Sequence, residues 1–385
     1  MSDRIDRIAV VRALPGVGDL LCAVPALRSI RDHHPDAEVT LVGLPAAAWF
    51  VGRYRDLVDD LLVVDGVPGL PEIDPDPAAA VRFFAEAQAR RFDLALQLHG
   101  DGRASNPLTT MLGARHQVTA HLAGGWVPPG TSIPYPGEGP EIHRLLAVTI
   151  AGGCPPAAED VDIPLGAAEA AAARRLTGDA GNGGEPGYAC LHPGASRDDN
   201  RWPAARFAAV GDLVAATGLR VVLTGTIHER PVVAEVAQAM TAPVIDLCGT
   251  TSIGTLAAVF ARARLVVSND TGAAHVAAAV RTPSVVVFPA DGDPERWAPL
   301  DRDLHARVTP EPGAGGDPPD TWPATSAVVA AALDALDRPD AGGPSDPHAM
   351  RARGNGADRS GRAPAAEPAH GQAPPPSPPS RPPAR

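Results

Sequence analysis

Continuous apolar segments alternate with longer amphipathic ones over most of the chain. In the first part, apolar segments lie at 8–11, 39–42, 61–64 and 94–98, and helical periodicity runs at about 20–33 and 78–91. Strands that are apolar throughout and are separated by helices are typical of a parallel sheet covered on both faces. We therefore predict one α/β domain that begins near Ile8 and ends near Gly153.

A second series with the same alternation follows a change in composition. Residues 155–186 are rich in Ala, Gly, Pro and acidic residues, and 179–185 has the composition of a flexible connector. Beyond it, the pattern predicts strands at 188–191, 220–223, 244–247, 265–268 and 284–288, and helices at about 204–217, 229–240, 253–263, 276–280 and 325–336. We thus expect two doubly wound α/β domains in tandem, at 1–165 and 186–337.

Residues 338–385 differ from everything before them. Pro, Gly, Ala, Ser and Arg dominate this segment, which has too few large apolar residues to form a core. We expect a disordered tail without a chemical role.

Composition narrows the class of partner. The chain has 385 residues, 44% of them hydrophobic, and a formal net charge of −12, which argues against nucleic acid or an anionic membrane as the main partner. All 33 residues counted as Lys or Arg are arginines. The four cysteines show neither zinc nor disulfide spacing, and no apolar run reaches transmembrane length. We expect a soluble, cytoplasmic monomer with at most peripheral contact to a membrane.

The junction between the strand at 265–268 and the next helix carries the strongest chemical signal. It reads Asn269-Asp270-Thr271-Gly272-Ala273-Ala274-His275. A strand that turns on Gly into a helix presents free N–H groups and the positive end of a helix dipole, which favour a phosphate. The alternative is an ordinary turn in which Asp270 or Thr271 caps the helix.

The first strand is followed by a glycine-containing turn that ends in a carboxylate. This turn contains Gly16 and Gly18, but Cys22 stands where a dinucleotide-binding motif has its third Gly, and no acidic residue closes the second strand. Both absences weaken an NAD-binding interpretation. Asp19 is then either a helix cap or a general base facing the space between the two domains.

Two loops of the second domain offer further ligand-binding groups. In the loop at 192–203, Gly194 permits close approach of a ligand to the backbone, Ser196 can donate to phosphate, and Arg197 or Arg201 can supply a cation. Glu229 follows the next strand, where a carboxylate could accept ribose hydroxyls or simply occupy a solvated first helical turn.

Two metal motifs are not supported. Asp291-Gly292-Asp293 resembles an Asp-x-Asp metal site, but its place before Pro294 is better explained by a tight turn. His228-Glu229 lacks the second His that a zinc hydrolase needs.

Taken together, these segments resemble glycosyltransferase family 9, the ADP-heptose:lipopolysaccharide heptosyltransferases, which are inverting enzymes with the GT-B fold. The resemblance covers about residues 5–300 and depends on the order and spacing of short motifs. They are Val11-Arg12, Gly18-Asp19 with Pro25-Ala26-Leu27, His192-Pro193-Gly194-Ala195-Ser196 with Trp202-Pro203, Gly225 with Glu229, Leu247-Cys248-Gly249 with Leu256, and Asn269-Asp270-Thr271-Gly272 with His275. It implies two Rossmann-like domains that face each other across a cleft.

The resemblance also implies a role for each candidate residue. Asp19 is expected to be the base that removes the acceptor proton. The expected donor-binding residues are Gly194, Ser196, Arg201, Glu229, Asp270, Thr271, Gly272 and His275. Acceptor or phosphate contacts are expected from Arg12, Gly18, His99 and Arg103. The co-substrate would be a nucleotide sugar, ADP-heptose, used without a cofactor or a metal, because a helix N-terminus can stabilise the departing diphosphate.

One position departs from the family pattern. The family usually has a Lys two residues before the Trp-Pro pair, and here that residue is Asn200. The cationic role would then pass to Arg201, Arg197 or Arg12.

The acceptor and two other functions stay open. The acceptor could be a lipopolysaccharide core sugar, another glycan or a different hydroxyl compound. A sugar-nucleotide epimerase of the GT-B fold would need no acceptor, and a non-catalytic sugar-nucleotide-binding protein would show no turnover.

Overall fold

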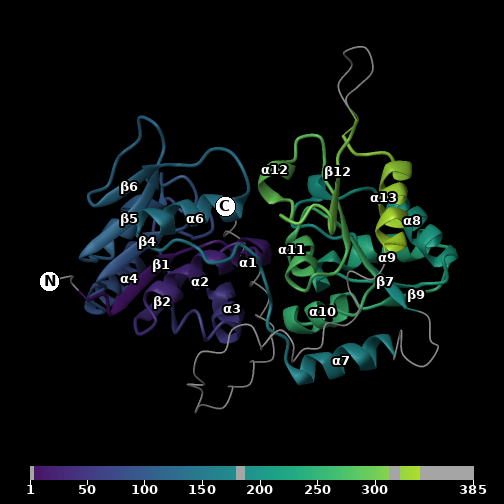
Figure 1. The fold of residues 1–385 in the computed structure, drawn as a ribbon, viewed down its shortest axis with the longest axis horizontal. Coiled ribbons are helices and arrows are strands. Elements are labelled where there is room, and N and C mark those ends of the chain that lie inside the picture. Colours follow the sequence, from purple (N-terminus) through teal and green to yellow (C-terminus); the bar gives the residue numbers. More distant parts are fainter. Residues whose placement is uncertain (1–3, 179–186, 312–320, 339–385) are drawn as a thin grey trace, which may run out of the picture. The chain divides into compact units, whose positions relative to one another are not determined.

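The computed structural model describes residues 4–178, 187–311 and 321–338. It contains two six-stranded sheets flanked by helices (Figure 1). The predicted connector at 179–185 and the predicted tail beyond Arg338 lie outside the described residues. Both sheets belong to one compact unit, so the domain boundaries at 165 and 186 stay predictions.

The first half of the chain forms a sheet with the strand order β3-β2-β1-β4-β5-β6. Its strands are β1 (Arg7–Val11), β2 (Glu38–Gly43), β3 (Asp60–Val63), β4 (Leu94–Gln97), β5 (His116–His121) and β6 (Thr131–Pro134). Its helices are α1 (Val17–Leu21), α2 (Val24–His33), η1 (Pro45–Ala47), α3 (Ala48–Arg53), α4 (Pro77–Ala89), α5 (Ser105–Met111) and α6 (Glu141–Ala151).

The second half forms a sheet with the order β12-β11-β10-β7-β8-β9. Its strands are β7 (Tyr188–His192), β8 (Arg220–Leu223), β9 (Val244–Asp246), β10 (Leu265–Asn269), β11 (Ser284–Val287) and β12 (His305–Val308). Its helices are α7 (Ala167–Thr177), η2 (Asp198–Asn200), α8 (Ala204–Ala216), η3 (Ile227–Glu229), α9 (Arg230–Ala239), α10 (Ile253–Phe260), α11 (Gly272–Ala279), α12 (Pro294–Trp297) and α13 (Thr325–Asp337).

The two sheets have the same topology. Numbered within its own half, each sheet has the strand order 3-2-1-4-5-6, and its strand pairs are parallel. In such sheets ligands bind outside the carboxyl ends of the strands where the order reverses. These points lie after β1 and β4 in the first sheet, and after β7 and β10 in the second.

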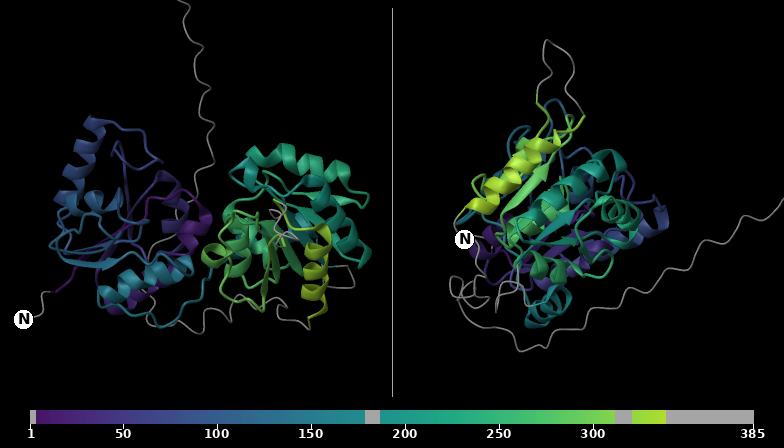
Figure 2. Two further views of the ribbon diagram at one scale, coloured as in Figure 1. Left: turned by 90° about the horizontal axis from the view of Figure 1, so that it is seen from above. Right: turned by 90° about the vertical axis from the view of Figure 1, so that its right-hand side faces the viewer.

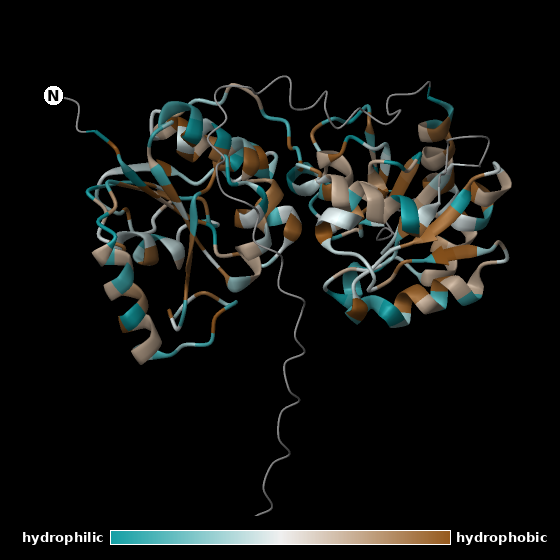
Figure 3. Ribbon diagram, turned by 90° about the horizontal axis from the view of Figure 1, so that it is seen from below, coloured by the Kyte–Doolittle hydropathy of each residue, from teal (hydrophilic) through white to brown (hydrophobic). Residues whose placement is uncertain are grey.

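The central strands form the core because they are apolar on both faces. Val10, Val11, Val266 and Val267 are completely buried. Helices cover the sheets in both views of Figure 2, and the hydrophobic colouring of the strands contrasts with more polar helix faces in Figure 3. Two parallel α/β sheets were predicted from this pattern, and they are confirmed.

The helix predicted at 20–33 is two helices. α1 ends at Leu21, and α2 begins at Val24. Pro25 has no N–H to donate to the preceding turn, which explains why one helix cannot continue through this position. The break limits α1 to five residues, little more than one helical turn, and Asp19 is its middle residue.

The Ala- and Gly-rich stretch that precedes the predicted connector contains α7, for which the sequence analysis predicted no helix. This helix is rich in Ala, which favours helix formation, and the Glu169 side chain accepts a hydrogen bond from Gly166 N at its start. Glu169 also pairs with Arg53 of the first half. Strands β5, β6 and β12 were not predicted from the sequence. They carry polar and partly exposed residues in place of a continuous apolar run.

The described residues add two general facts. None of the described helices combines the length and hydropathy that a bilayer-spanning helix requires. The four cysteines, Cys22, Cys154, Cys190 and Cys248, are buried free thiols.

Candidate functional site

The loops after β1 and β4 meet at the carboxyl edge of the first sheet. Arg12 and Ala13 follow β1, and His99 follows β4. Ala13 N donates a hydrogen bond of 3.1 Å to Nδ1 of His99. Burial, followed by the charge of Arg12, lowers the pKa of His99 to about 4. His99 is therefore a neutral imidazole at pH 7, and its Nε2 carries the proton.

Asp19 lies in the first turn of α1 with its side chain 23% exposed. The carboxylate folds back over Gly16, where a Cβ atom would collide with it. Burial raises the pKa of Asp19 and outweighs the lowering effect of Arg12. A carboxylate that is desolvated but still reachable from solvent is suited to accept a proton.

Arg12 is completely buried and is held by several partners. Nη1 donates to Leu98 O at 2.7 Å and to Oε1 of Glu141 at 3.0 Å, and Nε donates to Asp19 O at 3.1 Å. Nη2 lies 3.6 Å from Oδ1 of Asp19. Arg12 is thus positioned by the protein beside the Asp19 carboxylate.

Glu141 was missed by sequence reasoning. It is the first residue of α6. Its Oε2 accepts a hydrogen bond of 2.9 Å from Nε of Arg296 on α12 and forms an ion-pair contact of 2.9 Å with Nη2 of the same residue. A lone acidic residue after Gly139-Pro140 gives no signal that it will meet Arg12, 129 positions earlier in the chain. Only the folded arrangement identifies it.

Arg103 lies in the loop between β4 and α5. Its side chain is 78% exposed and forms an ion pair of 3.4 Å with Asp101. The described contacts of Arg103 are those of a solvated surface residue, so its expected contact with acceptor or phosphate stays a prediction.

In the second half, Asn269 joins the loops after β7 and β10. Its amide nitrogen donates to Pro193 O at 2.9 Å and to Gly194 O at 3.2 Å, and its oxygen accepts from Trp202 N at 3.0 Å. Asn269 is completely buried. The motif that begins at Asn269 predicted no role for this residue, and in the structure it fixes the two loops relative to each other.

The loop after β10 leads directly into α11. Thr271 is the N-cap residue, and its Oγ1 accepts a hydrogen bond of 3.2 Å from Ala273 N. The cap occupies one N–H group of the first turn. A capping role and phosphate binding at the remaining N–H groups are compatible.

Asp270 lies at the same helix start. Burial, with a smaller effect of the Asp293 carboxylate, raises its pKa to about 7. Near neutral pH, part of the Asp270 population is therefore protonated and can donate a hydrogen bond.

Gly194 and Glu229 are adjacent. A Cβ atom on residue 194 would collide with the Glu229 carboxylate, so the missing side chain is required for this approach. Oε2 of Glu229 accepts a hydrogen bond of 2.6 Å from Thr226 N and lies 3.9 Å from Nε2 of His192. Glu229 closes the start of η3, but it is buried and not a solvated acid.

The remaining candidates for binding the donor phosphates, Ser196, Arg197 and Arg201, lie in the loop that follows Ala195. Ser196 is exposed, and so is Arg197, which pairs with Asp199. Arg201 donates from Nε and Nη2 to Ala195 O at 3.1 and 2.8 Å and pairs with Asp198. Among the candidate arginines in this loop, Arg201 is the one held in place by backbone.

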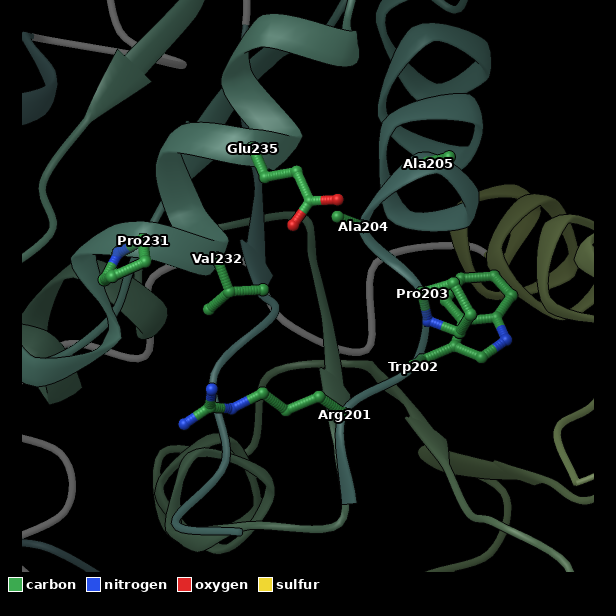
Figure 4. Close-up of a pocket in the computed structure, with 8 residues that line it drawn as sticks. All are labelled: Arg201, Trp202, Pro203, Ala204, Ala205, Pro231, Val232 and Glu235. Atoms are coloured by element: carbon green, nitrogen blue, oxygen red, sulfur yellow. The ribbon is translucent and has the colours of Figure 1, made fainter. Parts of the chain in front are cut away.

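A pocket of about 410 Å³ adjoins this loop (Figure 4). Arg201 and Trp202 point to opposite sides of the chain leading into α8. The pocket is lined by Arg201, Trp202, Pro203, Ala204, Ala205, Pro231, Val232 and Glu235. Of the predicted donor-binding residues, it includes only Arg201.

His275 faces the first half of the chain. Its Nδ1 lies 3.6 Å from Sγ of Cys22, and a Cβ atom on Gly18 would lie 3.0 Å from its Nε2. Burial lowers the pKa of His275 to about 4 and raises that of Cys22 to about 12, so both groups are neutral. Gly18 thus permits close packing of α1 on α11.

Asp291-Gly292-Asp293 adopts the tight turn that was predicted here in place of a metal site. Gly292 N donates to Pro289 O at 3.1 Å, and the Asp293 carboxylate accepts from Arg296 N at 3.1 Å as the cap of α12. Within the described ranges, no group of three or more His, Cys, Asp or Glu side chains is arranged to hold a metal ion.

Two parallel sheets of identical Rossmann-like order, with polar loops at their carboxyl edges, are the architecture of the GT-B fold. The Veillonella parvula family 9 glycosyltransferase structure superposes with a TM-score of 0.70 at 19% identity, covering 87% of this chain and 98% of that chain. The structure of Escherichia coli ADP-heptose LPS heptosyltransferase II gives 0.65 at 16% identity, covering 86% and 98%.

Residues 81–312 match the model of glycosyltransferase family 9 (heptosyltransferase), and the chain belongs to this family. Lipopolysaccharide heptosyltransferase 3 of Escherichia coli is 26% identical over 301 residues, covering 74% of this chain and 84% of the relative. Lipopolysaccharide heptosyltransferase 1 of Salmonella typhimurium is 35% identical over 102 residues, covering 26% and 32%. The family resemblance predicted from the motifs is confirmed, and the chain is a glycosyltransferase.

Proposed function

We propose that this glycosyltransferase transfers a heptose from ADP-heptose to a hydroxyl group of a glycan, with inversion at the anomeric carbon and with Asp19 as the general base. The heptosyltransferase names of its relatives support the donor and favour a lipopolysaccharide acceptor. The proposal takes the enzyme as a cytoplasmic monomer that uses no cofactor or metal.

The observation that carries the proposal is the environment of Asp19. The carboxylate is largely desolvated, has a raised pKa and is 23% exposed at the start of a helix. An acceptor hydroxyl that reached it would lose its proton to Asp19 as its oxygen bonds to the anomeric carbon. The bond from that carbon to the diphosphate oxygen breaks at the same time, and ADP leaves with the electron pair.

The second half supplies groups suited to the departing diphosphate. The remaining free N–H groups of α11 lie beside Thr271 and Gly272, where the helix dipole favours an anion. Asp270 can stay protonated next to a phosphate, because its pKa is about 7 without any ligand. Ser196, Gly194 and Glu229 lie on the neighbouring loops, and we assign Glu229 to the ribose.

Arg201 is our choice for the cation that Asn200 cannot supply. Arg12 is buried among partners of the first half, and Arg197 is exposed and paired with Asp199. Arg201 is anchored on Ala195 O in the loop that Asn269 fixes to the start of α11. His275 would act indirectly by packing α11 against α1.

The decisive experiment compares Asp19→Asn with Asp32→Asn, an exposed substitution on α2. With ADP-heptose and a heptose-deficient lipopolysaccharide acceptor, Asp19→Asn should release ADP at least about 100-fold more slowly, as expected for a lost general base. Its affinity for ADP, measured by calorimetry, should match that of wild type. Asp32→Asn should behave as wild type, and an Asp19→Asn enzyme with normal turnover would disprove the assignment.

Three controls separate the other functions. Activity should survive EDTA. Incubation with ADP-heptose alone should leave the sugar unchanged, whereas an isomerised product would indicate an epimerase. If ADP-, GDP-, UDP- and dTDP-sugars are compared by thermal shift, ADP-heptose should stabilise the protein most.

A further inference from the structure

Glu141 is a buried carboxylate placed between two arginines from different halves of the chain. Its side chain is 3% exposed. Oε1 accepts from Nη1 of Arg12 at 3.0 Å, and Oε2 accepts from Nε of Arg296 at 2.9 Å and forms an ion pair of 2.9 Å with its Nη2. Burial alone would raise the pKa of Glu141, but the two guanidinium groups outweigh it and hold this pKa below its ordinary value.

Arg12 connects this carboxylate to Asp19. Its Nη1 donates hydrogen bonds to Glu141 and to Leu98 O, and its Nε donates to the backbone oxygen of Asp19. Its buried Nη2 has no hydrogen-bond partner among the described residues and lies 3.6 Å from Oδ1 of Asp19. The position of Nη2 beside the Asp19 carboxylate is therefore set by the contacts of the other two nitrogens.

Arg296 is held from two sides. Its guanidinium lies 4.5 Å from the ring centroid of Trp297, and its side chain is 26% exposed. Its helix, α12, is capped by Asp293, the carboxylate that acts on Asp270. Charges thus alternate from Arg296 through Glu141 and Arg12 to Asp19.

We propose that Glu141 is a positioning residue for the transfer reaction, which holds Arg12 against the first turn of α1 and fixes Arg296 of the second half to the same arrangement. The inference rests on the proposed role of Asp19. It goes beyond that role because Glu141 touches no substrate and acts only through the two arginines.

The charged groups around Asp19 determine the sign of each expected effect. Burial raises its pKa most, Arg12 and Arg296 lower it, and Glu141 and Glu72 raise it. The Cys22 thiol directly after α1 is neutral, and so is the His275 imidazole of α11 that it contacts. Removing the Glu141 charge should therefore make Asp19 more acidic, and removing the Arg296 charge should make it less acidic.

The test uses the full chain with Glu141→Gln and Arg296→Gln. The acid limb of kcat/KM should move to lower pH in Glu141→Gln and to higher pH in Arg296→Gln. Glu141→Gln should also lower kcat about tenfold at neutral pH, since Asp19 becomes a weaker and less well-placed base, while KM for the donor stays the same. A substitution that only loosened the fold would not shift the two limbs in opposite directions.

Matched controls lie next to each position. Glu138→Gln, three residues before Glu141, and Glu295→Gln, beside Arg296, both change an exposed carboxylate and should leave the pH profile unchanged. If Glu141→Gln folds poorly, Arg296→Gln still tests the proposal, because it removes the guanidinium group of Arg296, whose side chain is partly exposed. The proposal would be overturned if the acid limbs of the two kcat/KM profiles both stayed in place or moved in the same direction.

A second readout does not depend on turnover. The Asp19 carboxyl can be titrated by NMR in protein carrying ¹³C-labelled aspartate, with its signal assigned from its loss in Asp19→Asn. Opposite shifts of this titration in the two variants support the positioning role of Glu141 even if Asp19 proves dispensable for catalysis. Unchanged titrations, with Asp19 still essential, would refute the inference and leave the proposed function intact.

Discussion

The two halves of the candidate site hold their polar groups by different means. Around Asp19, ion pairs dominate, with Arg12, Glu141 and Arg296 in one connected set. In the second half, Asn269 fixes the loops through hydrogen bonds to uncharged backbone groups. The first arrangement sets the basicity of a carboxylate, whereas the second sets the shape of a surface.

This difference has a functional logic. A general base needs a defined pKa, and nearby charges change a pKa more strongly than neutral groups do. A site for a diphosphate needs N–H groups at fixed positions, and buried hydrogen bonds to backbone provide that rigidity without adding charge. The two halves should therefore respond differently to mutation and to pH.

The largest effect on stability is expected for Asn269→Ala. It removes three hydrogen bonds and leaves the buried Trp202 N–H unsatisfied, which should lower the free energy of unfolding by about 3 kcal/mol. Urea denaturation at pH 5 and pH 8 should give the same loss, because no titratable group takes part.

Asn200→Ala is the matched control, since Asn200 lies in the loop after β7 that Asn269 holds and is partly exposed. It should change the stability little. If Asn269→Ala were as stable as wild type, or if its effect depended strongly on pH, the contrast between the two halves would fail.

The same contrast explains how much the sequence could predict. The loops of the second half were found because each one follows directly after a predicted strand, so Gly194, Glu229 and Asp270 could be placed at a sheet edge from local pattern alone. Parallel topology then brings those edges together. The two sheets were predictable for the same reason.

Glu141 and Arg296 were not predictable from local pattern. They are 155 positions apart and lie in segments with no motif. Their pairing depends on how α6 and α12 are placed in the fold, which a hydrophobic pattern does not encode. The short α1 was also missed, because the apolar residues at 20–30 continue through the break at Pro25.

A smaller, pH-dependent effect is expected for Asp270→Asn. Burial raises the pKa of Asp270 to about 7 in the folded protein, above its ordinary value of 3.8. The folded state therefore binds a proton that the unfolded state releases, and stability falls as the pH rises from about 4 through 7. At pH 8 the wild type carries a poorly solvated charge that Asn lacks.

Asp270→Asn should accordingly stabilise the ligand-free protein by about 2 kcal/mol at pH 8 and have almost no effect at pH 4. Urea denaturation at the two pH values measures both numbers. Equal effects at the two pH values would show that the Asp270 carboxyl is not buried as described. A gain in stability together with weaker ADP binding would identify Asp270 as a residue kept for function.

The smallest effect concerns the contact where the two halves meet, and it is tested with two glycines. In Gly18→Ala the new methyl group would lie 3.0 Å from Nε2 of His275 and collide with its ring, so α1 and α11 must separate slightly at a cost of about 1–2 kcal/mol. Gly52→Ala adds a methyl group to α3 where no atom lies within 4 Å, and it should stabilise the protein by about 0.5 kcal/mol. Opposite shifts of the thermal midpoint would show that α1 packs tightly on α11 in solution. If Gly18→Ala were stabilising as well, α1 would not pack against His275 of α11 as closely as described.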